Sequence, residues 1–303
     1  MKKLLLLLLA LLLPLEGLAI DASQQVVYDV LPLEGPAPYA YHPEALSEDG
    51  LAYEDDSIAV RFETIRMFDT NIAVAHVSIR DASQFRTGLA AKKFPSKVTR
   101  RVPDMAEDNH AVLAVNGDYF SYRDKGIIKR NGQVLRNNPD KAFDLLMVDR
   151  KGDFIIVEDP SKSDKALAES EDIVHIFSFG PYLVKDGIKR PAAPDPYKKI
   201  SIDADKGHVR VCIGQTGPLS YVVFICEAKD AGHVNSKGLS IMQAADVAEA
   251  LGCSQAYNLD GGNSAWMWLC GKQLNTPWKQ GQKVRNVSDI IYFATLIPEV
   301  DAQ

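Results

Sequence analysis

The chain has 303 residues, of which 24% are charged and 46% hydrophobic, and its formal net charge at pH 7 is −6. These fractions are typical of globular proteins, and the length suffices for one large core. The acidic balance excludes a broad electrostatic attraction to nucleic acid or to anionic membranes. We expect a single compact domain of the α+β class, with mixed, strand-rich sheets and a few flanking helices.

Residues 1–19 have the composition of a secretory signal peptide. Lys2 and Lys3 precede a leucine-rich run at Leu4–Leu13, and a Gly-Leu-Ala sequence closes the segment. The run is short for a bilayer span and is followed by a proline and a glutamate, which favours cleavage over an uncleaved anchor. We therefore expect a secreted or cell-envelope protein with no integral membrane contact after cleavage.

Residues 20–57 carry several prolines and many acidic residues, and we expect an extended or loosely attached lead-in there. Apolar and polar residues alternate at 58–67 and again at 71–80, which predicts paired strands with one face on a core. We place the folded domain at residues 58–298.

Four cysteines in an exported chain permit up to two disulfides, in three possible pairings. Their spacing matches no zinc-binding pattern. Each lies in or beside apolar sequence, so buried free thiols are an equal alternative. The four are Cys212, Cys226, Cys253 and Cys270.

A buried-type strand at 111–115 ends in a polar turn. Asn116 offers a hydrogen-bond donor and an acceptor, Gly117 allows close backbone approach, and Asp118 adds a carboxylate. Tyr119 begins an aromatic pair that would form a wall of a site. This turn is either one side of a binding site or an ordinary capped strand end.

The middle of the chain is rich in strands. We expect strands or hairpins at 126–135, 145–149, 173–187, 199–213 and 221–226, the last one central in its sheet, and a short polar helix at 163–171. The 173–187 segment breaks at Gly180 and Pro181.

A second polar turn lies in residues 256–264. A helix is expected before it, because Ser240 and Gln243 have capping-box spacing and Gly252 stands where a left-handed C-cap residue belongs. The apolar run that follows ends at Asp260 and two glycines, whose amide groups can gather into an anion-binding nest. A hairpin turn with Asx-type hydrogen bonds is the alternative.

Five short motifs occur along the chain: Asn116–Phe120, Phe177–Pro181, Gly238–Ser240, Ala256–Ser264 and Arg285–Asp289. In this order and at these intervals they resemble the phosphodiester glycosidase family, secreted bacterial proteins similar to the catalytic domain of the lysosomal mannose 6-phosphate uncovering enzyme. The resemblance runs from about residue 58 to residue 298. It implies a mixed α/β domain whose site gathers these turns, and hydrolysis of a diester that joins a sugar's anomeric carbon to phosphate.

The chain also departs from the family pattern. Where the family commonly has Pro-Arg-Thr, Pro196 is followed by Tyr-Lys-Lys, and where many members have Asp-Gly-Arg, residues 226–228 read Cys-Glu-Ala. Lys198 or Lys199 is expected to supply charge in place of the first missing arginine, without a planar fork. Asn263 replaces a glycine, a smaller change because asparagine tolerates left-handed backbone.

The implied chemistry needs a carboxylate near the anomeric carbon or its attacking water, and donors that hold phosphate. We expect Asp260 to be the carboxylate, with Asp118 as its candidate partner. Arg285 is expected to hold phosphate, unless it makes a structural salt bridge. Further substrate contacts are expected from the amides of Gly261 and Gly262 on phosphate, from Asn116 and Ser264 on sugar hydroxyls, and from Gly117, Tyr119, Gly180, Lys198 and Asn263.

We therefore expect a secreted hydrolase that cleaves a sugar-1-phosphodiester, of the GlcNAc-1-phosphodiester kind, in envelope glycans or exopolysaccharide. Its alternative is a degenerate family member that binds phosphoglycan without turnover. No cofactor is expected. The sequence has no His-x-x-x-His pair and no committed metal site, while its scattered aspartates permit Ca²⁺ or Mg²⁺ without requiring either. Asp289 has the alternating position of a solvent-facing strand residue. The carboxylate separation that distinguishes retaining from inverting chemistry is left open.

Overall fold

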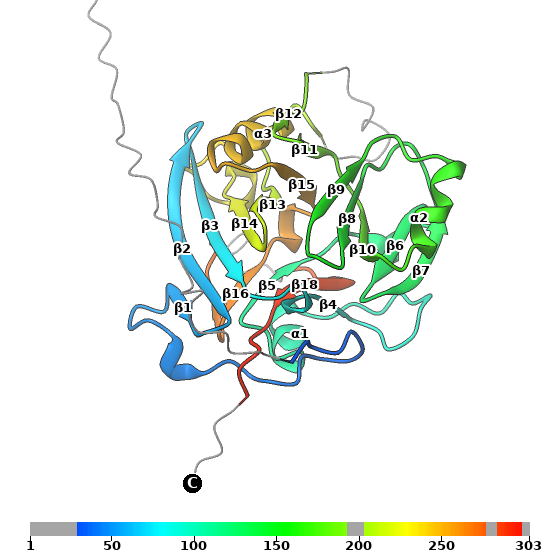
Figure 1. Cartoon of the computed structure of the whole chain (residues 1–303). Coiled ribbons are helices and arrows are strands. Elements are labelled where there is room, and N and C mark those ends of the chain that lie inside the picture. The colour runs from blue at the N-terminus through cyan, green and yellow to red at the C-terminus, as the bar shows by residue number, and fades with distance from the viewer. Residues whose placement is uncertain (1–28, 193–202, 277–283, 299–303) are drawn as a thin grey trace, which may run out of the picture.

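The computed structural model describes residues 29–192, 203–276 and 284–298. The expected signal peptide, residues 1–19, and the stretch 196–201 with Lys198 lie outside the described residues. The described chain forms three antiparallel sheets with helices against their faces (Figure 1). The expected α+β class, with strand-rich sheets and a few flanking helices in one compact domain, is confirmed.

The largest sheet has eight strands in the order β1-β2-β3-β14-β13-β15-β11-β12. Their bounds are β1 Ala52–Glu54, β2 Ile58–Met67, β3 Thr70–Ile79, β11 Tyr182–Lys185, β12 Ile188–Lys189, β13 Val211–Gly217, β14 Ser220–Cys226 and β15 Gln255–Leu259. β2 and β3 pair along their whole length, as their alternation predicted. β14 is central between β3 and β13, and its apolar run from Tyr221 to Cys226 is buried throughout because both of its faces are covered.

Two five-stranded sheets complete the domain. One has the order β7-β6-β10-β8-β9, and the other has the order β17-β16-β5-β18-β4. The first comprises β6 Gly126–Arg130, β7 Gln133–Asn138, β8 Leu145–Asp149, β9 Phe154–Val157 and β10 Ile173–Ser178. The second comprises β4 Phe85–Leu89, β5 Leu113–Asn116, β16 Met267–Leu269, β17 Lys272–Gln273 and β18 Asp289–Phe293. β5 and β15, the strands that precede the two polar turns, therefore belong to different sheets.

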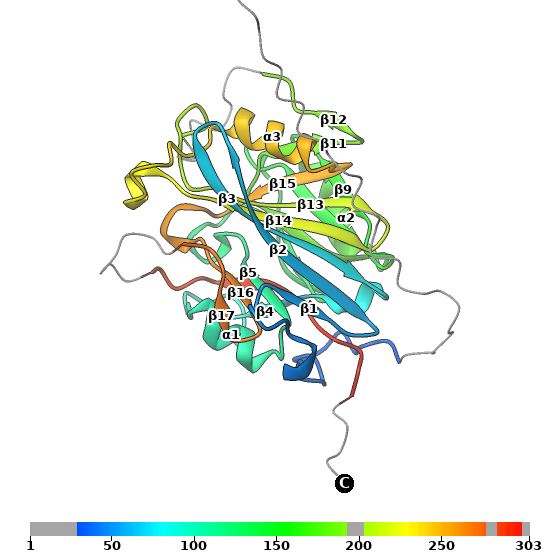
Figure 2. The same ribbon diagram turned by 90° about the vertical axis from the view of Figure 1, so that its left-hand side faces the viewer.

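The described residues form three α-helices, which are α1 Val102–Asp108, α2 Lys165–Glu169 and α3 Ile241–Ala250. α3 begins at the expected capping box, in which Ser240 accepts from the amide of Gln243 and the Gln243 side chain accepts from the amide of Ser240. Its alanine- and valine-rich face packs on β11, β12 and β15, whereas α1 lies at the opposite end of the molecule (Figure 2). α3 thereby supports the strand that carries the second turn.

The expected lead-in at 20–57 is described from residue 29 onward. There Leu31, Ala37 and Tyr53 are buried, and β1 pairs with β2. The buried ring of Tyr53 donates its hydroxyl hydrogen to Asp55 at 2.8 Å. This part of the segment thus packs against the strands that follow it.

The expected hairpin between 199–203 and 208–213 falls partly outside the described residues. Within the described chain, β13 pairs with β14 and β15.

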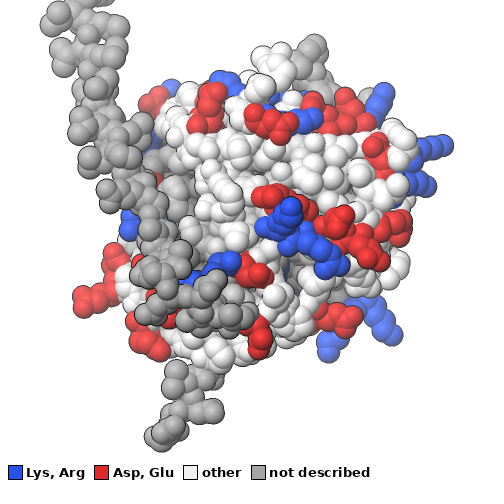
Figure 3. Space-filling view, in the orientation of Figure 1, with Lys and Arg blue, Asp and Glu red and all other residues white. Residues whose placement is uncertain are grey.

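The face in Figure 3 carries acidic and basic side chains interspersed, with no broad area of either sign. No described helix has the length and apolar character needed to cross a membrane.

All four cysteines are free and buried. Burial raises the pKa of Cys226 to about 11 and that of Cys253 to about 12, because a thiolate is poorly solvated among apolar side chains. Of the two alternatives that the sequence left open, the structure has buried thiols.

Thiol titration tests this arrangement. Native protein should leave the four cysteines unreacted with a thiol reagent, because they are shielded and protonated, and protein unfolded in guanidinium without reductant should show all four as free thiols. A count of two or none after unfolding would show that the native protein contains disulfides.

Candidate active site

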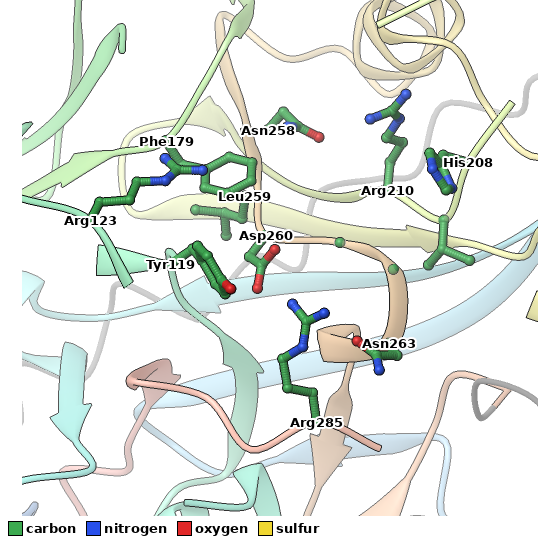
Figure 4. A pocket seen from close by; sticks show the side chains of 13 residues that line it. Tyr119, Arg123, Phe179, His208, Arg210, Asn258, Leu259, Asp260, Asn263 and Arg285 are labelled. Atoms are coloured by element: carbon green, nitrogen blue, oxygen red, sulfur yellow. The ribbon is translucent and has the colours of Figure 1, made fainter. Parts of the chain in front are cut away.

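A pocket of about 460 Å³ opens where β15 ends. The loops that follow β5 and β10, the segment that precedes β13 and the segment that precedes β18 supply its other walls (Figure 4). The lining residues are Tyr119, Arg123, Phe179, His208, Val209, Arg210, Asn258, Leu259, Asp260, Gly261, Gly262, Asn263 and Arg285. A volume of this size suits a small organic ligand.

The two polar turns meet at this pocket through one side chain. The Asn116 amide group donates to the carbonyl oxygen of Asp260 at 2.6 Å, and its oxygen accepts from the backbone amide of Trp266 at 3.1 Å. Asn116 is fully buried. It therefore braces the turn after β5 against the turn after β15, and the expected contact with sugar hydroxyls does not fit this placement.

The Asp260 side chain is half-buried at the pocket. Burial raises its pKa to about 6, because the charged form loses solvation. The Ser264 hydroxyl, Arg285 and Arg123 each lower the pKa and offset part of this rise, while Asp118 adds to it. Asp260 is thus poised to exchange a proton near neutral pH.

The Ser264 side chain is fully buried and does not line the pocket. Its hydroxyl lowers the pKa of Asp260, although the Oγ atom has no hydrogen-bond partner within the described residues. A contact between Ser264 and sugar hydroxyls, as the sequence suggested, therefore does not fit the structure.

The two glycines after Asp260 are required by packing against the segment before β13. A Cβ atom on Gly261 would come close to the carbonyl oxygen of Val209, at 2.3 Å, and Gly262 has a left-handed φ of 61°. The Gly262 amide donates to the same Val209 oxygen at 3.0 Å. It is therefore committed within the protein, so the expected role of this amide in holding phosphate is not supported.

Asp118 points away from the pocket into a buried ion cluster. Arg130 donates from one Nη to Asp118 at 2.9 Å and from Nε to Asp289 at 2.7 Å, and all three side chains are almost fully buried. Asp118 also accepts from the backbone amides of Phe120 and Ser178, at 3.0 Å each. The cluster ties the first polar turn to the end of β10 and leaves Asp118 unavailable as a second carboxylate in the pocket.

Asp289 was expected to face solvent, and this expectation is wrong. It begins β18, which lies between β4 and β5, and all five residues of this strand are buried, so both of its faces are covered. Burial raises the pKa of Asp289, and Arg130 opposes the rise. Gly117 accommodates this carboxylate, because a Cβ on Gly117 would overlap it.

Tyr119 and Gly180 have different placements. Tyr119 lines the pocket, and its ring stacks on that of Tyr122 with centroids 4.4 Å apart. Gly180 has a φ of 77° and accepts from the side-chain amide of Asn258 at 2.9 Å. Gly180 does not line the pocket, whereas the adjacent residue Phe179 does. The contribution of Gly180 to the site is therefore its backbone conformation and its carbonyl oxygen.

Two arginines approach Asp260 from different sides (Figure 4). Arg285 is exposed, its guanidinium carbon lies 5.5 Å from the Tyr119 ring centroid, and its backbone amide donates to Asn263 at 3.0 Å. Arg123 comes from the loop after β5 and adjoins Phe179. Arg210 differs, since its guanidinium donates to backbone carbonyl oxygens, including that of Leu239 at 3.0 Å.

The departures from the family pattern can be partly located. Lys198 and Lys199 lie outside the described residues. Glu227 accepts from the side chains of Asn71 at 2.9 Å and Ser236 at 2.6 Å in a separate small pocket. Neither Glu227 nor Lys229 lines the pocket around Asp260.

Sequence reasoning missed Arg123, Phe179, His208, Val209 and Arg210 as lining residues. Phe179 lay within a motif quoted for the family, and this was a usable signal. Arg123 stands in a polar loop among other charged residues, where solvent exposure is the default interpretation. His208 faces the carboxylate of Asp230 at 2.6 Å, a pairing between residues far apart in sequence.

The described residues contain no cluster of side chains suited to bind a metal ion. In residues 29–192, 203–276 and 284–298, no three His, Cys, Asp or Glu side chains are grouped to hold a metal ion. The described part of the pocket has a single carboxylate, Asp260, and several cationic side chains. This donor set favours an anionic ligand.

The geometry agrees with comparisons to known proteins. A family model for phosphodiester glycosidases matches residues 109–294, well over half of the chain. The catalytic domain of zebrafish N-acetylglucosamine-1-phosphodiester alpha-N-acetylglucosaminidase, auto-inhibited by its pro-peptide, is similar in fold, with a TM-score of 0.61 at 16% identity, and the match covers 85% of this chain and 86% of that one.

Two bacterial structures are also similar. A hypothetical protein from Synechocystis has a TM-score of 0.53 at 14% identity, over 78% of this chain and 62% of that one. A Burkholderia pseudomallei protein named as exported has a TM-score of 0.53 at 12% identity, over 75% and 74%. No curated protein sequence matches this chain.

The buried ion cluster should be a large contributor to stability. Arg130→Met removes the shared cation and leaves two carboxylates buried without it, so we expect a loss of about 3–5 kcal/mol in the free energy of unfolding. Urea denaturation measures this loss, and Arg66→Met, at an exposed arginine, should change stability by no more than about 0.5 kcal/mol. Equal stability of Arg130→Met and the parent protein would contradict the assigned role of the cluster.

Proposed function

Because this chain belongs to the phosphodiester glycosidase family, we propose that it is a hydrolase that cleaves a sugar-1-phosphodiester in envelope or extracellular glycans. The observation that carries the proposal is Asp260, a half-buried carboxylate with a pKa raised to about 6 in a pocket that three arginines also line. A carboxylate of this kind suits a base or a nucleophile, and the cations suit a phosphate.

In the proposed reaction, the bond between the anomeric carbon and the phosphate oxygen breaks, and its electron pair leaves with the phosphate. The Asp260 carboxylate either accepts a proton from the water that attacks the anomeric carbon, or attacks that carbon first and is released by water. The products are a free sugar and a phosphomonoester. The leaving phosphate is already a stable anion, so one carboxylate suffices where ordinary glycoside hydrolysis uses two.

The remaining pocket residues divide between the two ends of the substrate. Arg285 is our candidate for the phosphate, since a guanidinium can donate two parallel hydrogen bonds to phosphate oxygens. Asn263, whose carbonyl oxygen accepts from the amide of Arg285, is our candidate for the sugar. Tyr119 supplies an aromatic wall between them.

We further propose that the protein is exported. The composition of residues 1–19 supports this location, and so does the similarity in fold to a Burkholderia protein named as exported. Export would bring the enzyme to the phosphorylated glycans of the cell envelope.

Replacement of the carboxylate tests the reaction. Asp260→Asn should lower sugar release from a GlcNAc-phosphodiester model substrate by at least about a hundredfold, because the amide can neither accept the proton nor attack carbon. Asp205→Asn makes the same substitution at an exposed aspartate and should leave the rate unchanged. Urea denaturation of both variants controls for folding.

Two results would count against the proposal. If folded Asp260→Asn releases sugar at the parental rate, Asp260 is not the catalytic carboxylate. If the parent protein binds phosphoglycan tightly in calorimetry and releases no sugar from a panel of such substrates, the protein is a binding protein without turnover.

The pH dependence provides an independent test. The reaction needs ionised Asp260, so kcat/KM should fall about tenfold for each pH unit below a midpoint near 6. Arg285→Gln removes a nearby positive charge that favours the ionised form, so its midpoint should move to higher pH. A midpoint that stays in place in Arg285→Gln would contradict this coupling.

A further inference from the structure

Arg123 is a pocket arginine that has no hydrogen-bond acceptor among the described residues. Its Nη1 atom is shielded from solvent and has no hydrogen-bond partner, and no ion pair involves Arg123 among the described residues. A shielded donor of this kind is costly unless a ligand or water satisfies it. The position of Arg123 in the pocket wall points to a ligand.

By contrast, two almost fully buried arginines, Arg86 and Arg130, do have acceptors. Arg130 donates to two carboxylates. Arg86 donates to the hydroxyl oxygen of Tyr292 at 2.9 Å and to the carbonyl oxygen of Gly35 at 3.0 Å. Arg123 therefore differs from the arginines that stabilise the fold, and a structural salt bridge does not account for it.

Two aromatic rings hold the Arg123 guanidinium in place. Its Cζ atom lies 4.7 Å from the centroid of the Phe143 ring and 4.5 Å from that of the Phe179 ring. We call these two rings the aromatic clamp. Contacts with ring faces attract a guanidinium without occupying its N–H donors, so the charge is held in position with its hydrogen-bonding capacity intact.

The electrostatic surroundings agree with a role in the site. Burial lowers the pKa of Arg123, while Asp118 and Asp260 raise it. An arginine nevertheless stays protonated at any physiological pH. A bound anion would replace the solvation that burial has removed from the guanidinium.

We propose that Arg123 is a further substrate-binding residue, which binds the phosphoryl group of the substrate while Arg285 approaches from the other side of Asp260. This inference rests on the proposed function, in which the substrate is a sugar-1-phosphodiester. A diester phosphate has two non-bridging oxygens, and two guanidinium groups on different sides can each take one. The anomeric carbon then lies over Asp260, and the sugar extends toward Asn263.

Binding of simple phosphates tests the proposal without depending on turnover. Isothermal titration with dimethyl phosphate and with inorganic phosphate, at constant ionic strength, should give affinities that Arg123→Gln weakens by about tenfold to a hundredfold. Arg123→Lys keeps the positive charge without the planar guanidinium, so its affinity for these phosphates should lie between that of the parent protein and that of Arg123→Gln. Arg61→Gln is the control, because Arg61 is exposed and lies outside the pocket.

The aromatic clamp is tested by variants that retain the arginine. Phe179→Leu should weaken dimethyl phosphate binding by about threefold to tenfold, because the guanidinium loses one of its rings. Phe154→Leu, the same change at a buried ring outside the pocket, should leave binding unchanged. These variants also keep the test informative if Arg123→Gln does not fold.

The outcomes separate this inference from the proposed hydrolysis. Failure of the parent protein to bind either phosphate, or parental affinity in both Arg123→Gln and Phe179→Leu, would overturn the assignment. If phosphate binding depends on Arg123 but no sugar is released from any phosphodiester, the assignment stands and the proposed hydrolysis fails.

Discussion

The architecture of the pocket depends on one hydrogen-bonded side chain, the amide of Asn116. Its donor and acceptor join the turn after β5 to the turn after β15, and these strands belong to different sheets. The Asp118–Arg130–Asp289 cluster fixes the first turn from beneath, and α3 supports β15. The relative position of the two sheets therefore sets the position of Asp260, and local turn geometry alone does not determine it.

Burial and charge act in opposite directions on Asp260. Loss of solvation raises the pKa of the carboxyl, whereas the neighbouring hydroxyl and the two arginines lower it. Burial alone would make the carboxyl a weaker acid, and the cations alone would make the carboxylate a weaker base. The balance gives a carboxylate that is ionised at neutral pH and still basic, which suits the proposed attack at an anomeric carbon.

Local sequence patterns predicted the elements well, because their causes are local. The capping box at Ser240 and the alternation in β2 and β3 act over a few residues, and the structure contains them as expected.

The orientation of side chains within the site was harder to predict. Asn116, Asp118 and Ser264 lie at the expected turns, but all three side chains are buried. The partners of Asn116 and Asp118 are distant in sequence, and their positions could not be read from the turns themselves. The alternating pattern also gave a wrong prediction for Asp289, which was expected to face solvent. Its strand has a neighbouring strand on each side and is buried on both faces, so it has no solvent-exposed face. Arg123 depends on rings contributed by residues far along the chain, and the sequence around it gave no sign of them.

The aromatic clamp has a consequence for how this scaffold can change. Arg123 is attached to the framework by ring contacts, on a loop outside the strands that position Asp260. Exchange of the arginine alone would alter which leaving groups the protein accepts while the buried ionic support remains as it is. The rings are less free to change, because Phe179 is also part of the hydrophobic core. New specificities can therefore arise at position 123 with less effect on folding than at the rings that hold it.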